Sequence, residues 1–305
     1  KIIIIDSSNN IREFGKGDRL VKIKLKNKSI EKKLFRNPAL HLGEGYMNEE
    51  ILIQKGTIEE LIDIVTACYD DFIRNNSIYR FYENFSGYVK VFQQLNETIK
   101  SKKNVTHHYD LKEDLYKLFL DKDMQYSCAY FHNENISLDQ AQIDKKNHII
   151  NKLQIKENMS VLDIGCGWGG MALEIAKQTG AKVRGITLSE NQFATASRRA
   201  QEEGLSDKVS FQIQDYRDEK LKYDRIVSVG MFEHVGIKYF KPYLKKTYDL
   251  LKDNGVFLLH TIGQRGVPTA TSPWIRKYIF PGGYIPSLSD IIIEAQKLTI
   301  NITDV

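Results

Sequence analysis

Four glycines within six residues follow a short apolar run near the middle of the chain. Residues 161–164 read Val-Leu-Asp-Ile, and residues 165–170 read Gly-Cys-Gly-Trp-Gly-Gly. Glycine lets the backbone turn sharply and approach a ligand without a Cβ in the way. The free N–H groups that open the following helix favour an anionic group. This run predicts a small molecule held against bare backbone, because turning alone does not require four glycines.

Two classes of cofactor fit such a loop. The spacing of Gly165, Gly167 and Gly170 satisfies the dinucleotide fingerprint. That fingerprint also requires an acidic residue about 20 positions further on, at the end of the second strand. The expected second strand, 182–189, carries no carboxylate, which weakens the dinucleotide interpretation. Asp163 and the short turn after it look instead like the S-adenosylmethionine loop of class I methyltransferases.

The segments around this loop alternate between strand and helix. Strands are expected at 161–164, 182–188, 209–214, 225–229 and 255–261, and helices at 171–178, 191–203 and 239–251. This alternation predicts an α/β fold with a doubly wound, Rossmann-like parallel sheet. Ligands bind beyond the carboxyl ends of the strands in such sheets, so the residues that follow each strand are the candidates for the site.

The first 86 residues follow a different pattern, in which short strands precede a helix at about 57–65. We predict a small N-terminal α+β domain over 1–86, a helical connector over 87–104 and a second domain over 105–305. Within the first domain, strict alternation places Lys22, Lys24 and Lys26 on one face of a strand. That face is either a solvated surface or a docking surface for an anionic partner, membrane or nucleic acid.

Composition sets the outer bounds. The chain has 305 residues, is 42% hydrophobic and 27% charged, and has a formal net charge of +5, which is ordinary for a soluble globular protein of two domains. Cys68, Cys128 and Cys166 are far apart, which favours a reducing, cytosolic compartment and predicts no metal site. The longest aliphatic run, 2–5, is too short to span a bilayer. A missing initiator methionine and an abrupt end after an apparent strand indicate an excerpt of a longer polypeptide, with an incomplete C-terminus.

Several motifs in a fixed order then make the sequence specific. They lie at 107–111, 126–131, 165–169, 187–192, 232–236, 259–263 and 273–281. In this order they closely resemble the cyclopropane-fatty-acid-phospholipid synthase family, which is related to the mycolic acid cyclopropane synthases. Residues 43–48 resemble the end of the small N-terminal lipid-binding domain of that family. The resemblance implies a methyl transfer from S-adenosylmethionine to the cis double bond of an acyl chain in a membrane phospholipid.

The resemblance also implies a cofactor site at the strand ends. Two residues would close over the methionine end of the cofactor, three would lie in or before the glycine loop, two would bind the ribose and two would flank the adenine. In that order they are Tyr126 and Ser127; Asp163, Gly165 and Gly167; Thr187 and Gln192; Tyr216 and Arg217. Members of the family often have Trp where this chain has Tyr216. Any planar aromatic ring can pack on adenine, so this difference concerns affinity.

In the same family a bicarbonate ion acts as the base. Carried over to this sequence, it would be held by the backbone at Cys128 and Ile262 and by the side chains of Glu233 and His260. A further tyrosine of that pocket would lie beyond residue 305. The alternative is structural: Glu233 would cap a helix starting near Gly236, and His260 would be a satisfied polar group at a strand end.

The chemistry explains why a base is needed. Methyl transfer to an unactivated alkene leaves a carbocation, and loss of one proton from the new methyl group closes the ring. A carboxylate alone beside such a cation risks forming an ester, which makes a small bound anion a plausible base. Placement of the base decides between ring closure and elimination, so a C-methyltransferase giving a methylene-branched, methyl-branched or furan-precursor chain is an alternative.

Two other classes of function fit the residues less well. An inactive lipid-transfer or membrane-binding module is disfavoured by the intact glycine loop, Glu233 and His260. A nucleic-acid methyltransferase is disfavoured because the sequence has no Asn-Pro-Pro-Tyr-like motif for a flipped base. The resemblance implies a phospholipid membrane surface with unsaturated acyl chains as the partner, and no nucleic acid is expected. We expect peripheral association with the inner face of a bacterial cell membrane, and a homodimer as a further assembly.

Overall fold

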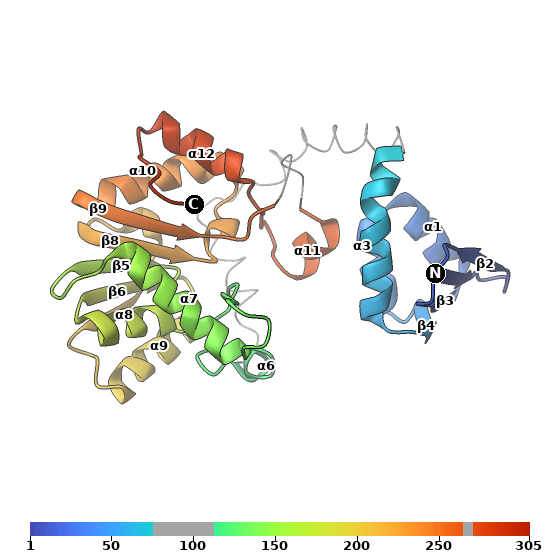
Figure 1. The fold of residues 1–305 in the computed structure, drawn as a ribbon, viewed down its shortest axis with the longest axis horizontal. Coiled ribbons are helices and arrows are strands. Elements are labelled where there is room, and N and C mark those ends of the chain that lie inside the picture. The colour runs from blue at the N-terminus through green and yellow to red at the C-terminus, as the bar shows by residue number, and fades with distance from the viewer. Residues whose placement is uncertain (76–112, 265–270) are drawn as a thin grey trace. The chain divides into compact units, whose positions relative to one another are not determined.

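The computed structural model describes residues 1–75, 113–264 and 271–305. These residues belong to two compact units (Figure 1), and each unit is described by itself. The first unit comprises Lys1–Lys90 and Thr269–Pro281, and the second comprises Val91–Pro268 and Gly282–Val305. The connector expected at 87–104 and the motif at 107–111 lie outside the described residues.

The first unit contains a mixed sheet with the strand order β2-β1-β3-β4. Its strands are β1 (Ile2–Ile5), β2 (Ile11–Phe14), β3 (Val21–Leu25) and β4 (Ile51–Lys55), and its helices include α1 (Lys28–Arg36), α2 (Pro38–Met47) and α3 (Ile58–Asn75). Val21, Ile23 and Leu25 are buried in a core that also takes in Ile30 of α1 and Leu61 of α3. Successive side chains of a strand point to opposite faces, so the lysines of β3 lie on the face away from these helices.

One short helix of the first unit comes from far along the chain. This helix, α11 (Pro273–Tyr278), packs against α2. A Cβ at Gly43 would clash with the Trp274 ring, so only glycine allows this approach. The Glu44 carboxylate accepts hydrogen bonds from the Lys277 ammonium and, at 2.8 Å, from the Tyr278 hydroxyl. These bonds lower the pKa of Glu44 to about 2. The motifs at 43–48 and 273–281 therefore contact each other.

The second unit is built on a five-stranded sheet with the order β7-β6-β5-β8-β9, and every paired strand runs parallel. The strands are β5 (Ser160–Ile164), β6 (Lys182–Thr187), β7 (Val209–Ile213), β8 (Tyr223–Val229) and β9 (Leu251–His260). The α-helices are α6 (Glu113–Lys117), α7 (Leu138–Leu153), α8 (Gly170–Thr179), α9 (Glu190–Glu202), α10 (Phe240–Leu250) and α12 (Leu288–Lys297). The prediction of a doubly wound, Rossmann-like α/β fold is confirmed.

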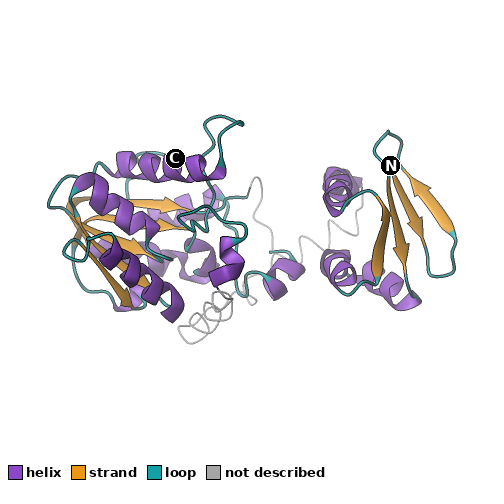
Figure 2. Cartoon of the chain, turned by 90° about the horizontal axis from the view of Figure 1, so that it is seen from below, coloured by secondary structure: helices purple, strands orange, loops and turns teal. Residues whose placement is uncertain are grey.

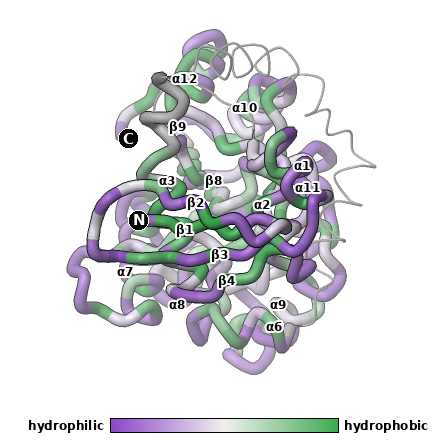
Figure 3. Tube along the Cα trace, turned by 90° about the vertical axis from the view of Figure 1, so that its right-hand side faces the viewer, coloured by the Kyte–Doolittle hydropathy of each residue, from purple (hydrophilic) through white to green (hydrophobic). Residues whose placement is uncertain are grey.

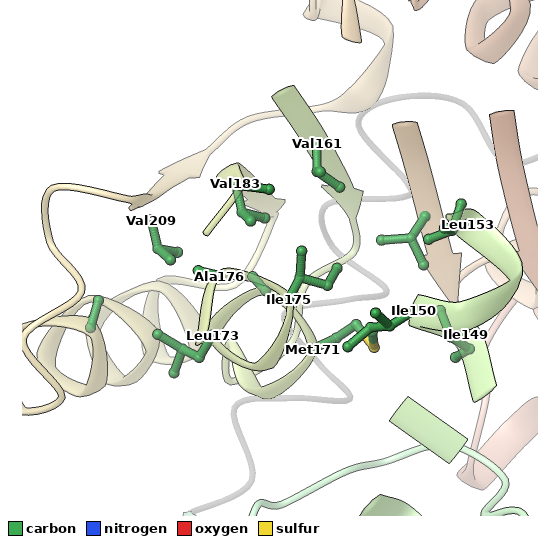
Figure 4. Close-up of a cluster of buried hydrophobic side chains, with 14 residues drawn as sticks. Ile149, Ile150, Leu153, Val161, Met171, Leu173, Ile175, Ala176, Val183 and Val209 are labelled. Atoms are coloured by element: carbon green, nitrogen blue, oxygen red, sulfur yellow. The ribbon is translucent and has the colours of Figure 1, made fainter. Parts of the chain in front are cut away.

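Helices cover both faces of this sheet (Figure 2). On one face, α7, α8 and α9 pack over alternate residues of the strands, including Val161, Val183, Val209 and Val227 (Figure 4). On the other face, α10 and α12 enclose a second apolar cluster with Phe232 at its centre. The direction of strand order reverses between β5 and β8, and a ligand site is expected at the carboxyl ends of these strands.

Candidate active site

The glycine loop joins the end of β5 to the start of α8 and has one open side. Gly165 has φ +79°, and a Cβ there would lie 2.7 Å from the Cγ of Met231. Gly167 has φ +53°, but a Cβ there would meet no described protein atom within 4 Å. Packing within the protein thus accounts for Gly165, whereas the open space beside Gly167 fits a ligand that approaches the backbone.

One pocket at the carboxyl ends of the strands brings together all nine residues expected to bind the cofactor. The residues are Tyr126, Ser127, Asp163, Gly165, Gly167, Thr187, Gln192, Tyr216 and Arg217. They come from the segment before α7, from the glycine loop, and from the ends of β5, β6 and β7. Parallel strands place their carboxyl ends at one edge of the sheet, which is why the residues at the ends of β5, β6 and β7 meet here. Tyr126 and Ser127 reach the pocket from the segment before α7.

Asp163 is a buried carboxylate at the base of this pocket. It is 2% exposed, and its Oδ2 has no hydrogen-bond partner among the described residues. Burial raises the pKa of Asp163 to about 7, although the positive charge of Lys145 opposes the rise. A buried, unpartnered carboxylate is costly, so this position suits a ligand that supplies a cation or hydrogen-bond donors.

The two residues expected at the ribose are fixed by local hydrogen bonds. The Thr187 hydroxyl donates to the side-chain oxygen of Gln192 at 2.8 Å and accepts from the backbone N–H of Ser189 at 3.2 Å. Ser189 caps α9 by accepting from the N–H of Gln192. Because the amide oxygen of Gln192 is engaged by Thr187, its NH₂ group is the part available to a ligand.

The residues expected at the adenine form a short 3-10 helix, Tyr216–Asp218, after β7. Arg217 makes two side-chain hydrogen bonds to Asp215, from Nε at 2.8 Å and from Nη2 at 2.6 Å. The Arg217 guanidinium also lies 5.4 Å from the centre of the Tyr216 ring. The Tyr216 ring in turn meets Tyr243 edge to face, with centroids 5.0 Å apart. The aromatic ring at 216 is therefore held on the pocket wall.

Glu233 and Ile262 of the expected base site contact each other directly. Glu233 lies in a short 3-10 helix, Phe232–His234, is 7% exposed, and accepts a 2.7 Å hydrogen bond at Oε1 from the backbone N–H of Ile262. Its Oε2 is buried and has no partner among the described residues. Burial raises the pKa of Glu233. The capping alternative is wrong, because Glu233 Oε1 accepts from the N–H of Ile262 and Oε2 accepts from no described group.

His260 and the residue before Cys128 both approach Gly230, which follows β8. The His260 carbonyl at the end of β9 accepts from the N–H of Gly230, and a Cβ at Gly230 would lie 3.4 Å from the Cβ of Ser127, the residue before Cys128. The buried His260 Nδ1 has no partner among the described residues. Burial, assisted by the charge of Lys145, lowers the pKa of His260. The Cys128 thiol is exposed, which agrees with a role for its backbone only.

Sequence reasoning missed the roles of three polar residues near these sites. Asp215 follows a strand in the sequence, but its part in holding Arg217 was not predicted. Gln142 and Lys145 lie on α7, which was not expected, and both are buried against the segment 125–127. The signal was present in principle as a run of polar residues at helical spacing. A residue's burial, however, depends on packing that spacing alone does not give.

Comparison with known proteins agrees with this geometry. Residues 96–305 match the family model described as mycolic acid cyclopropane synthetase, and residues 7–77 match a domain of unknown function. The cyclopropane-fatty-acyl-phospholipid synthase of Escherichia coli K12 is 40% identical over 273 residues, which is 88% of this chain and 68% of that protein. A probable fatty acid methyltransferase of Pseudomonas putida is 41% identical over 208 residues, covering 66% of this chain and 53% of that protein.

A solved structure shows the same fold in the second unit. The mycolic acid cyclopropane synthase CmaA1, in complex with SAH and CTAB, aligns with a TM-score of 0.62 and 33% identity over 67% of this chain and 76% of that one. The fold and the pocket thus define an S-adenosylmethionine-dependent methyltransferase. More specifically, the chain belongs to the mycolic acid cyclopropane synthetase family.

Proposed function

We propose that this enzyme transfers the methyl group of S-adenosylmethionine to the cis double bond of an unsaturated phospholipid acyl chain and closes a cyclopropane ring. The observation that carries the proposal is the position of two buried polar atoms without a partner among the described residues, Glu233 Oε2 and His260 Nδ1. Neither residue lines the cofactor pocket, but His260 pairs in the sheet with Val229, and Glu233 precedes His234, and Val229 and His234 do line it. The synthase activity in the name of the E. coli relative supports the same chemistry.

The pocket residues would bind and orient the cofactor. S-adenosylmethionine supplies an electrophilic methyl group on a sulfonium. Asp163 and the backbone at Gly167 would hold its methionine part, the NH₂ group of Gln192 would reach the ribose, and the Tyr216 ring would pack on the adenine. Asp215 would act through Arg217, since their paired hydrogen bonds fix the guanidinium beside the Tyr216 ring.

Glu233, His260 and the backbone at Ile262 and Cys128 would hold a small anion that serves as the base. Bicarbonate fits this donor and acceptor set because it can donate one hydrogen bond and accept several. Glu233 Oε2 can accept a hydrogen bond from the hydroxyl of bicarbonate, and Nδ1 of His260 can donate one to a bicarbonate oxygen when Nδ1 carries the proton. The Ile262 N–H already orients the Glu233 carboxylate. With the anion in this place, the proton of the new methyl group would leave without an ester forming on Glu233.

The first unit would bring the enzyme to its lipid substrate as a lipid-binding domain. The face of its sheet away from the helices carries Lys22 and Lys24, and Lys26 follows at the end of β3. The neighbouring strand β1 is hydrophobic along its length (Figure 3), and its Ile3 pairs with Lys22 and so lies on the lysine face of the sheet. Lysines beside apolar side chains suit an anionic phospholipid surface. No helix among the described residues is long and apolar enough to cross a bilayer. From the lysine face we propose peripheral binding at the inner face of the cell membrane. We also propose a homodimer as the assembly.

A related product is the alternative. The P. putida relative is named a probable fatty acid methyltransferase, so the same cation could end as a methyl- or methylene-branched chain. Both outcomes can lose the proton from the new methyl group. A methylene branch first needs a hydride shift that moves the cation to the methylated carbon, and its product keeps a double bond, whereas a cyclopropane has none. Because a cyclopropane and a methylene branch have the same mass, mass alone does not separate them.

Expression in a bacterial host that lacks such an enzyme tests the proposal. Phospholipid acyl chains should gain one CH₂ and should resist ozone, because a cyclopropane has no double bond. Ozone-sensitive chains of the same mass would support the branched alternative. Unchanged acyl chains, from a host that makes folded enzyme and unsaturated lipid, would contradict the proposed function.

A further inference from the structure

Lys145 is a buried lysine with neutral partners. It lies on α7, is 3% exposed, and donates hydrogen bonds to the Ser127 hydroxyl at 2.7 Å and to the Gln125 side-chain oxygen at 3.0 Å. Within the described parts of the chain no carboxylate lies within ion-pair distance of its Nζ. Burial lowers the pKa of Lys145 to about 8, although the charges of Asp121 and Asp123 oppose this shift. Taking an ammonium out of water without a carboxylate at ion-pair distance is unfavourable. Structural stability alone therefore gives no reason for a lysine here.

The neighbouring lysine shows the contrast. Lys146 is 4% exposed, and its Nζ is paired with Asp123 at 2.7 Å and with Glu174 at 3.3 Å. A buried ammonium of this kind is compensated by charge. The two lysines lie on the same helix and are equally buried, and they differ in what their side chains contact. Of the two, Lys145 is the one that contacts the segment lining the cofactor pocket.

Gln142, one turn before Lys145, holds the same segment by its backbone. Its side-chain NH₂ donates to the carbonyl of Ser127 at 2.9 Å and to the carbonyl of Gln125 at 3.2 Å. Residues 142 and 145 are three apart and so share one face of the helix. Four hydrogen bonds from this face thus fix residues 125–127, all three of which line the pocket.

We propose that Lys145 is a positioning residue of the cofactor pocket, which acts through Ser127 and Gln125 to hold the segment 125–128 over the methionine end of S-adenosylmethionine. The proposal rests on the proposed function only for the identity of the reaction, because its first readout is cofactor binding. The charge of Lys145 also affects the pocket, since it opposes the rise in the pKa of Asp163 and helps to lower the pKa of His260.

A double-mutant cycle on S-adenosylmethionine binding, measured by calorimetry, tests the proposal. Lys145→Met should weaken binding about tenfold, as expected for a lost hydrogen bond from a charged group. Ser127→Ala should weaken it by a similar or smaller factor. The double variant should bind no more than about twofold worse than the weaker single variant, because both changes remove one interaction.

Lys146→Met is the matched control. It should lower the melting temperature, because Asp123 and Glu174 lose their shared cation. Its cofactor affinity should stay within about threefold of the wild type, because Arg199 still pairs with Asp123, whose Oδ2 accepts from the Gln125 side chain. In turnover assays, Lys145→Met should raise the KM for S-adenosylmethionine by a larger factor than it lowers kcat. If Lys145→Met fails to fold, Lys145→Gln, which can still donate to Ser127, should give an intermediate affinity.

Three results would overturn the proposal: wild-type affinity in folded Lys145→Met, additive losses in the double variant, or an equal loss in Lys146→Met. A different result would count against the proposed function alone. If the wild type binds S-adenosylmethionine and the cycle behaves as described, but no cyclopropane forms, then Lys145 keeps its role and the reaction is another methyl transfer.

Discussion

Replacing Asp163 by Asn should stabilise the enzyme in the absence of cofactor and weaken cofactor binding. Asp163 is 2% exposed, and its Oδ2 has no partner among the described residues, so its charge is unfavourable in the folded chain. Burial raises the pKa of this group from 3.8 to about 7. A carboxyl with a higher pKa in the folded state takes up a proton on folding. Its contribution to stability is complete below pH 4 and is lost as the pH rises through about 7.

The size of the effect follows from the two pKa values. A difference of one in pKa between the folded and unfolded chain corresponds to about 1.36 kcal/mol, so the full contribution is about 4 kcal/mol. Between pH 5 and pH 8 the wild type should lose about 2 to 3 kcal/mol at this group. Asparagine does not titrate. The difference in unfolding free energy between Asp163→Asn and the wild type should therefore move by this amount in favour of the variant as the pH rises.

Urea unfolding at pH 5 and pH 8 without added cofactor measures this difference. The chain has two tryptophans, Trp168 and Trp274, so a Trp274→Phe background leaves Trp168 to report on the second unit. Comparing variant and background cancels the titration of all other groups. A difference that is equal at both pH values, or that moves in favour of the wild type at pH 8, would refute the reasoning. Calorimetry should also show at least about tenfold weaker S-adenosylmethionine binding.

Three further predictions concern the loop, the base and the membrane. Gly167→Ala should cost about 1 to 2 kcal/mol of stability, because the φ of residue 167 is +53°, and should weaken cofactor binding. Gly165→Ala should lose more stability, because its Cβ would meet Met231. Melting measures the stability and calorimetry the affinity, and wild-type S-adenosylmethionine binding by Gly167→Ala would contradict the prediction. Glu233→Gln can keep the hydrogen bond from the Ile262 N–H but replaces the unpartnered acceptor Oε2 by a donor, so turnover should fall by about 100-fold with cofactor affinity unchanged. Wild-type activity should also fall in carbonate-free buffer. A folded variant with normal turnover would refute the role of Glu233. Reversing the charges of Lys22, Lys24 and Lys26 should weaken the free energy of binding to anionic vesicles by roughly 1 kcal/mol per lysine, measured by sedimentation, and should leave cofactor affinity unchanged. Equal vesicle binding by variant and wild type would show that this face is only a solvated surface.

The sequence predicted the sheet of the second unit because its strands are short apolar runs that end in polar or glycine residues. The ends of β5, β6 and β7 could therefore be named in advance. The nine cofactor residues, of which Tyr126 and Ser127 precede α7, were assigned from the resemblance to the synthase family, and all nine line one pocket. The contact between Glu233 and Ile262 joins residues 29 apart in sequence through neighbouring strand ends. Its geometry depends on how far β8 and β9 extend, which an apolar run defines only to within a few residues.

Other features could not be predicted because they depend on tertiary packing. Gln142 and Lys145 look like surface residues of a helix, since their side chains are polar. Their burial arises only because the segment 125–127 folds over them. Likewise, α11 lies within the expected second domain but packs on α2 of the first unit, through the fit of Gly43 to Trp274. Both contacts join segments that have no local signal for each other.

The most direct test of the central claim is the isotopic composition of the product. Purified enzyme would be incubated with vesicles of an unsaturated phospholipid and S-adenosylmethionine whose methyl group carries three deuterium atoms. Methyl transfer followed by loss of one proton from that methyl group should give an ozone-resistant acyl chain that retains two deuterium atoms. An acyl chain that retains all three, or one that carries two but is cleaved by ozone, would show that no ring closes and would contradict the assignment as a cyclopropane synthase.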